Sequence, residues 1–179
     1  KAWNYTAKHN PEFSQRLFTD VQMSNFMTEH YTKHPVFANR VIDAFWSINP
    51  VYGTARADLF RYALLYELGG VYLDAKSAAR DISRAIRKND AFVTSHWAMS
   101  SVVRYWSILH LKKIRGEYQQ WWLASIPRHP VLETVLNMTV DNIHGYVNRE
   151  NDQDTCDRVR NIFGDSLVLY LVPACKGVD

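Results

Sequence analysis

Cysteine is scarce in this chain, and long apolar runs are missing. Cys156 and Cys175 are the only cysteines among 179 residues. No C-x-x-C motif or Cys/His cluster points to a zinc site, and the two thiols allow either one disulfide or two free cysteines. A membrane-spanning helix needs about 20 consecutive apolar residues, and neither such a run nor a signal peptide is present. The residues given therefore predict no membrane span of their own.

Runs of one charge are missing as well. The net charge is +3, and the densest basic stretch, Arg80 to Lys88, is interrupted by Asp81 and two isoleucines. We interpret this stretch as a solvated helix face, because a nucleic-acid patch usually shows a longer unbroken Lys/Arg run. We expect no nucleic-acid partner, whereas a small anionic ligand such as a nucleotide diphosphate suits the mild positive charge.

The composition is that of a globular protein, with 47% hydrophobic and 22% charged residues. This size and composition predict one sizeable core, and we expect residues 1–179 to form a single domain. The chain begins at Lys1 without an initiator methionine. We therefore expect a fragment of a longer protein, in which any membrane association comes from segments outside this sequence.

Apolar spacing and turn residues predict strands that alternate with helices, which favours an α/β fold. Loops are predicted at 127–130 and 148–157. The predicted strands are 13–20, 71–74, 91–98 and 166–174. The predicted helices are 21–31, one that Pro35 opens and Asn49-Pro50 breaks, 54–68, 101–111 and 131–147.

Arg61 and Tyr62 follow Asp58 by three and four residues in the helix predicted at 54–68, so all three share one face. Taken alone, this spacing favours a simple Asp–Arg ion pair. The next predicted strand ends on Asp74, and open α/β sheets bind ligands at the carboxyl ends of their strands. An acid there, near an Asp and an Arg, predicts a sugar-nucleotide pocket. A structural scaffold in which Asp58 and Arg61 only pair is the simpler alternative.

The stretch ADLFRYALLYELGGVYLD, residues 57–74, resembles the signature of the glycosyltransferases that contain the DXD sugar-binding region. Nine positions fit the pattern A-D-x-x-R-Y-x-x-L-x-x-x-G-G-x-Y-x-D. Two flanking stretches are similar more loosely, WNYTAKHNPEFSQRLFTD before it and ASIPRHPVLETVLNMTVDNI after it. The family includes initiating α-1,6-mannosyltransferases and capsular-polysaccharide glycosyltransferases. The resemblance covers roughly residues 3–145.

The resemblance implies a GT-A, Rossmann-like sheet flanked by helices and truncated at its N-terminus. It also implies a UDP- or GDP-sugar donor, a glycan or other hydroxyl acceptor, and transfer of a hexosyl unit with retention. A microbial or viral member would act in the cytoplasm or at a membrane, and a eukaryotic one in the Golgi lumen. Position by position, it implies donor binding by Asp58, Arg61, Tyr62, Gly69, Gly70 and Asp74, catalytic roles for Asp58, Arg61, Asp74 and Lys76, and metal binding by Asp74.

Lys76 departs from the motif, because the second acid of D-x-D normally stands there and helps to bind Mn²⁺ or Mg²⁺. Three interpretations follow. Lys76 replaces the cation and meets the diphosphate directly in a metal-independent enzyme. Alternatively, Asp81 completes a metal site. In the third interpretation, the chain is a non-catalytic module that binds a sugar or nucleotide and has lost the metal site.

Several other residues have a structural and a functional interpretation. His96, His129 and His144 are candidates for a general base or metal ligand, although isolated histidines are usually structural. The pair Trp121-Trp122 suits either stacking on an acceptor sugar or core packing. Tyr72 is interpreted as a packing residue.

Overall fold

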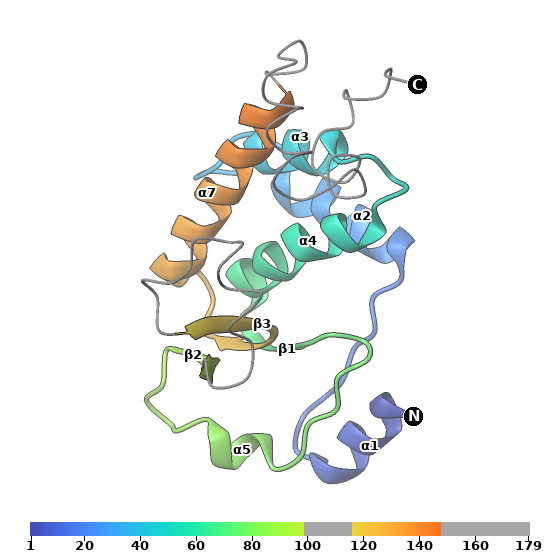
Figure 1. Cartoon of the computed structure of the whole chain (residues 1–179), viewed down its shortest axis with the longest axis vertical. Helices are drawn as coiled ribbons and strands as arrows, with labels where there is room; N and C mark the ends of the chain where they lie inside the picture. Colours follow the sequence, from blue (N-terminus) through green and yellow to red (C-terminus); the bar gives the residue numbers. More distant parts are fainter. Residues whose placement is uncertain (99–115, 148–179) are drawn as a thin grey trace. The chain divides into compact units, whose positions relative to one another are not determined.

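The computed structural model describes residues 1–98 and 116–147 (Figure 1). The chain divides into two compact units. Of the described residues, the sheet unit contains Lys1–Phe18 and Leu64–Pro130 without 99–115, and the helical unit contains Thr19–Ala63 and 131–147. Both cysteines and three predicted segments lie outside the described residues, namely the helix 101–111, the loop 148–157 and the strand 166–174.

The sheet unit contains an antiparallel sheet of three strands in the order β1-β3-β2. The predicted strands at 71–74 and 91–98 are confirmed as β1 (Gly70–Leu73) and β2 (Phe92–Ala98). Strand β3 (Gly116–Ser125) was not predicted. Its sequence, GEYQQWWLAS, lacks the alternation of apolar and polar residues that identifies a half-buried strand. Its Tyr and Trp residues, which favour strands, were the available signal.

The helices and this small sheet agree with the α/β class, whereas the GT-A assignment stays a prediction. The described strands run antiparallel, with Leu73 of β1 opposite Trp122 of β3 and Phe92 of β2 opposite Ser125. The rule for ligands at the carboxyl ends of parallel strands therefore does not apply to these three strands. Any site role of Asp74 has to rest on its local geometry.

The sheet unit also holds α1 (Ala2–His9), α5 (Ile82–Ala85) and the end of α4 (Gly53–Leu68). Residues 80–88 are helical only over α5, so the predicted helix face there is mostly wrong. The basic side chains of this stretch are nevertheless exposed, as expected of a solvated surface. Among the described helices, none is both long and apolar enough to cross a membrane.

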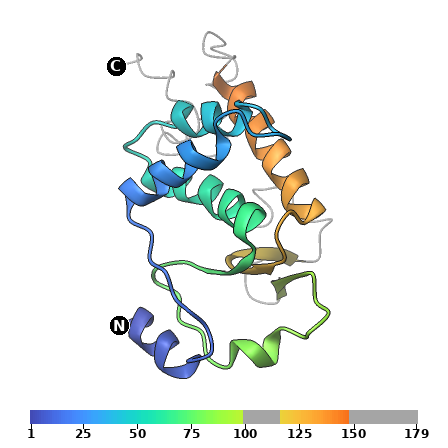
Figure 2. The same cartoon turned by 180° about the vertical axis from the view of Figure 1, so that it is seen from behind.

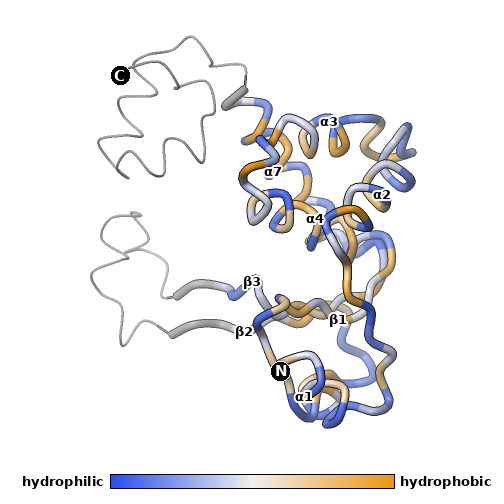
Figure 3. The backbone as a smooth tube through the Cα atoms, turned by 90° about the vertical axis from the view of Figure 1, so that its right-hand side faces the viewer, coloured by the Kyte–Doolittle hydropathy of each residue, from blue (hydrophilic) through white to orange (hydrophobic). Residues whose placement is uncertain are grey.

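The helical unit contains α2 (Asp20–Tyr31), α3 (Arg40–Ser47), most of α4 and α7 (Pro130–Val147) (Figure 2). Hydrophobic and hydrophilic segments alternate along these helices in Figure 3, as expected of helices that bury one face. The Tyr31 hydroxyl donates a hydrogen bond to the Ala63 carbonyl at 2.9 Å, which ties α2 to α4. The core includes Met27, Tyr31, Phe37, Val41, Ala44, Phe45, Leu59, Phe60, Leu132, Leu136 and Val140.

The predicted strand 13–20 is wrong, because its end belongs to the start of α2. The Thr19 hydroxyl accepts a hydrogen bond from the Gln22 N–H, and the Gln22 side chain accepts one from the Thr19 N–H. This is a capping box, in which a Thr and a Gln three residues later satisfy N–H groups of the first turn. The sequence T-D-V-Q was the missed signal.

The second predicted helix begins later than expected. Pro35 lies in a turn closed by the His34 ring, whose Nδ1 atom accepts hydrogen bonds from the N–H groups of Val36 and Phe37. The helix starts only at Arg40. The other three predicted helices within the described residues match closely, since α2 covers Asp20–Tyr31, α4 ends at Leu68 and α7 ends at Val147.

Candidate functional site

Three predicted site residues share one face of α4 and belong to the helical unit. The Arg61 Nη2 group donates a hydrogen bond to Asp58 Oδ1, which confirms the expected ion pair. The Arg61 side chain is 5% exposed, whereas the Asp58 side chain is 36% exposed. Solvent, and therefore a ligand, reaches the carboxylate more easily than the guanidinium group. The burial of Arg61 favours a role in holding Asp58.

Tyr62, on the same face, is half-buried. Burial raises its pKa above the usual value of 10.0, with a smaller lowering by Arg61 and a smaller rise from Asp58. The phenol therefore stays neutral at neutral pH and suits hydrogen-bond donation to a ligand rather than proton abstraction. Because the folded state holds the Tyr62 proton more tightly than the unfolded state, this group's contribution to the free energy of unfolding is lost only as pH rises above about 10.

The Gly69-Gly70 turn joins α4 to β1 in the sheet unit. Both glycines have positive φ, +63° and +93°. A Cβ atom on Gly69 would lie 2.7 Å from Pro127 Cδ and 2.8 Å from the Ser125 carbonyl oxygen, whereas one on Gly70 would meet nothing within 4 Å. Gly69 is therefore required by close packing against the end of β3 and the Pro127 loop. A role of either glycine beside a donor stays a prediction.

Asp74 begins a tight turn directly after β1. Its N–H group donates a hydrogen bond to the Trp121 carbonyl at 3.1 Å, which continues the pairing with β3 by one residue. Its carbonyl accepts a hydrogen bond from the Ser77 N–H at 2.7 Å. Lys76 is exposed within this turn, and Asp74 is half-buried. One hydrogen bond to β3 and one within the turn thus hold the backbone of the D-A-K segment at Asp74.

A pocket of about 520 Å³ adjoins this turn within the sheet unit. Leu73 and Ser77, which flank the turn, both line it. Ligand pockets for small molecules have volumes of about 300–1,000 Å³, so the space suits a compact ligand. Sequence reasoning missed Ser77, Ser95 and Gln119 as lining residues, because nothing along the chain shows which residues β3 brings beside the turn.

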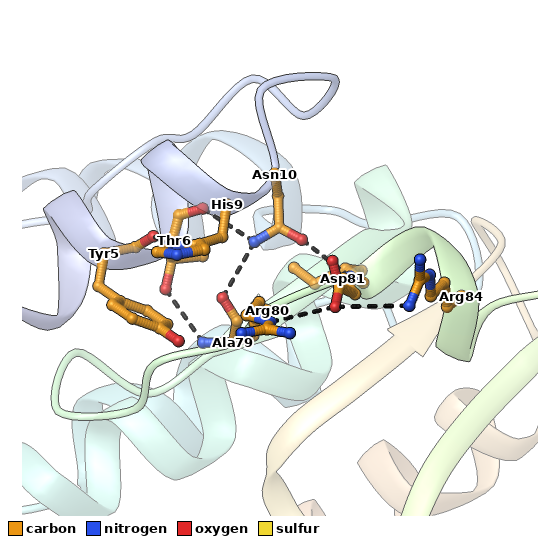
Figure 4. A network of polar contacts seen from close by, with 9 residues as sticks. Tyr5, Thr6, His9, Asn10, Ala79, Arg80, Asp81 and Arg84 are labelled. Carbon is orange, nitrogen blue, oxygen red and sulfur yellow. Dashed lines mark hydrogen bonds and ion pairs between the residues drawn. The ribbon is translucent and has the colours of Figure 1, made fainter.

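Asn10 holds the segment that follows the turn, through a set of hydrogen bonds shown in Figure 4. Its side-chain amide donates hydrogen bonds to the carbonyls of Thr6 and Ala79 and accepts one from the Ile82 N–H at 2.8 Å. The Thr6 hydroxyl accepts a further bond from the Ala79 N–H. Asn10 is fully buried. We call Thr6, Asn10, Ala79 and Ile82 the clasp, which connects the end of α1 to the start of α5.

We expect Asn10→Ala to lower the free energy of unfolding by about 2–3 kcal/mol, because it leaves buried backbone groups without their hydrogen bonds. Asn10→Asp should lose somewhat less stability than Asn10→Ala, since a carboxylate can accept the hydrogen bond from Ile82 but cannot donate to the two carbonyls. Asn4→Ala, an exposed position on the same helix, is the control. Urea denaturation measures all three. A loss below about 0.5 kcal/mol for Asn10→Ala, the range of surface substitutions, would contradict the clasp.

Among the described residues, those near the D-A-K segment offer few groups that could hold a metal ion. Asp74 supplies one carboxylate, and Lys76 stands where the motif has its second acid. Asp81 accepts a hydrogen bond from Arg80 Nε at 3.1 Å and lies 3.9 Å from Arg84, so two cations already oppose its charge. In the described ranges, no group of three His, Cys, Asp or Glu residues is placed to hold a metal ion. We therefore derive no step through a metal.

The remaining candidates are spread over several elements. The His129 ring stacks on Phe92 with centroids 5.3 Å apart, which favours its structural interpretation. The backbone of His96 pairs with Tyr118 in the sheet, and His144 lies near the end of α7. Tyr72 is half-buried in β1. Trp121 and Trp122 are half-buried and line the pocket, so they are not simply core residues.

Comparison with protein families identifies a match. The family described as "Glycosyltransferase sugar-binding region containing DXD motif" matches residues 1–93. This match spans α1, the clasp, the α4 signature and the D-A-K turn. No curated protein and no solved structure matches the chain. The matched region covers more than half of the 179 residues, and the chain therefore belongs to the glycosyltransferases with the DXD sugar-binding region.

Proposed function

We propose that this chain is a retaining glycosyltransferase that moves a hexosyl unit from a UDP- or GDP-sugar to a glycan or another hydroxyl acceptor. Membership of the family supports a sugar-nucleotide donor. The observation that carries the proposal is the fixed D-A-K turn, in which Asp74 lies between Leu73 and Ser77, two residues that line a pocket. A GT-A fold for the whole protein is part of the proposal.

The proposed reaction is a front-face displacement. The bond between the anomeric carbon and the diphosphate oxygen breaks, and a bond from the acceptor oxygen to that carbon forms on the same face. The acceptor proton passes to the departing diphosphate oxygen. This route asks the protein for positioning and for stabilisation of the negative charge that develops on the leaving group.

The side chains suggest a division of these tasks. Asp74 accepts hydrogen bonds from donor hydroxyl groups. Membership of the family supports the same role for Asp58, the exposed member of its pair. Arg61 orients Asp58 from its buried position. Lys76 is exposed and carries a mobile positive charge, which suits the diphosphate of the leaving group. In this arrangement, Lys76 takes the place of the cation, and donor binding is independent of added metal.

Calorimetric titration of UDP- and GDP-sugars with and without Mn²⁺, together with an assay for nucleotide release, tests this function. We expect Asp74→Ala to weaken donor binding at least about tenfold, because a hydrogen bond to a charged group contributes about 1.5–3 kcal/mol. Lys76→Ala should weaken it similarly. Lys76→Asp restores the second acid and should make binding depend on Mn²⁺. Lys88→Ala, at another exposed lysine of the sheet unit, is the control.

The outcomes separate the alternatives. Donor binding by the wild-type chain that needs Mn²⁺ would overturn the role of Lys76 but keep the transferase. Donor binding with neither hydrolysis nor transfer would favour a non-catalytic module that binds a sugar or nucleotide. This module is the second candidate function, because Lys76 stands where the motif has its second acid. If the folded chain binds no donor, the proposed function fails.

A further inference from the structure

The pocket beside the D-A-K turn has one wall made by the sheet. Leu73 and Trp122 are directly opposite partners, so their side chains lie on the same face. Val93 shares that face, because it pairs with Ala124, two residues along β3 from Trp122. All three line the pocket. Residues after the turn, Ser77 and Ala78 among them, line it as well.

The lining combines aromatic rings with polar groups. Trp121 and Trp122 are half-buried, whereas Leu123 and Ala124, which follow them in β3, are 4% and 5% exposed. The Ser95 hydroxyl donates a hydrogen bond to the Gln119 side-chain oxygen at 2.5 Å, which holds these two polar side chains together across β2 and β3. The Thr94 hydroxyl donates to the Gln119 carbonyl at 2.9 Å.

We propose that this pocket binds a hexopyranose ring of the acceptor, so that the preferred acceptor is a sugar rather than a protein hydroxyl group. The C–H bonds on one face of a pyranose pack against indole rings, which present a large apolar surface. The Ser95 hydroxyl carries two acceptor lone pairs and the Gln119 amide carries two N–H donors, which match the alternating donors and acceptors of sugar hydroxyl groups. Apolar walls with a few polar groups are typical of small-molecule sites.

The position of the pocket favours the acceptor over the donor. This step rests on the proposed function, in which Asp74 holds the donor sugar. Leu73 and Ser77, on either side of the turn, line the pocket, so a ligand there lies next to the donor rather than in its place. None of the described residues that line the pocket is an arginine or lysine, and this part of the lining disfavours a diphosphate as its occupant.

The test uses methyl α-mannoside, methyl α-glucoside and methyl β-galactoside with the whole chain, observed by saturation-transfer NMR with and without UDP and UDP- or GDP-sugars. We expect at least one glycoside to bind with millimolar affinity, and bound nucleotide sugar to leave that binding unchanged or stronger. Trp122→Ala should weaken the glycoside about tenfold. Ser95→Ala combined with Gln119→Ala, which leaves the apolar wall intact, should weaken it at least about threefold. Trp46→Ala, an exposed tryptophan of the helical unit, is the control.

The proposal fails if no glycoside binds, if the pocket variants leave glycoside binding unchanged, or if the nucleotide sugar displaces the glycoside. A loss of UDP or GDP binding in Trp122→Ala without a change for the glycosides would assign the pocket to the nucleotide and overturn it too. If the chain binds a glycoside but no donor, both the proposed function and the acceptor role of the pocket fail. The result would then show only that the pocket binds sugars.

Discussion

Replacing Gly69 by alanine is expected to lower the free energy of unfolding by about 2–5 kcal/mol. The positive φ of +63° costs an L-residue about 1–2 kcal/mol. The new Cβ atom would also approach the Pro127 nitrogen and the Ser125 carbonyl oxygen to 2.8 Å. These are backbone atoms of the strand end and the following loop, so relief requires the turn and β3 to move apart. That overpacking adds about 1–3 kcal/mol.

Gly70→Ala is the matched control, because it changes the neighbouring glycine of the same turn. Its φ is +93°, but its Cβ atom would meet nothing within 4 Å. We expect only the conformational cost, about 1–2 kcal/mol. Urea denaturation of the three proteins gives the comparison. Equal losses for the two variants would show that the contact between Gly69 and the Pro127 loop does not determine the cost.

Removing the carboxylate of Asp58 is expected to have the second large effect on stability, about 2–3 kcal/mol for Asp58→Ala. The Arg61 side chain is 5% exposed, and breaking a buried ion pair by deleting one partner costs about 3–5 kcal/mol. The expected loss is smaller here because the Asp58 side chain is 36% exposed, so solvent already weakens the pair. Asp58→Asn, which keeps an acceptor oxygen but removes the charge, should lie between wild type and Asp58→Ala.

Asp141→Ala provides the matched control within the same unit. Asp141 accepts a hydrogen bond from Arg40 at 2.5 Å, and their side chains are 67% and 46% exposed. An exposed ion pair contributes about 0–1 kcal/mol, so this variant should change stability little. Similar losses for Asp58→Ala and Asp141→Ala would show that the burial of Arg61 adds nothing.

Arg61→Met separates the structural role of this pair from its proposed role in donor binding. Methionine fills a similar volume without a charge, and the remaining Asp58 carboxylate is exposed enough to be hydrated. We therefore expect Arg61→Met to cost less stability than Asp58→Ala. Both variants should weaken donor binding if Asp58 contacts the donor. In Arg61→Met the Asp58 carboxylate is no longer oriented, and in Asp58→Ala it is missing. If donor affinity is unchanged in both folded variants, the pair is a structural scaffold only.

The sequence alone determined the helix, turn and strand that run from Gly53 to Leu73, and with them the family. These elements follow from local signals, namely helical spacing, a glycine at the helix end and a short β-prone run. The shared face of Asp58 and Arg61 is a consequence of the same spacing and was predicted correctly. The α7 helix was predicted for the same reason.

Only the tertiary structure decided which of these residues are buried and what lies beside them. Strand β3 has no alternating pattern, yet its place between β1 and β2 supplies both the pocket wall and the carbonyl that receives the Asp74 N–H. Asn10 is 69 residues from Ala79 along the chain, so no local pattern links the two. The burial of Arg61 and the close contact at Gly69 likewise depend on packing with residues distant in sequence. Spacing along one element shows which side chains share a face. Which residues pack against that face depends on the tertiary structure.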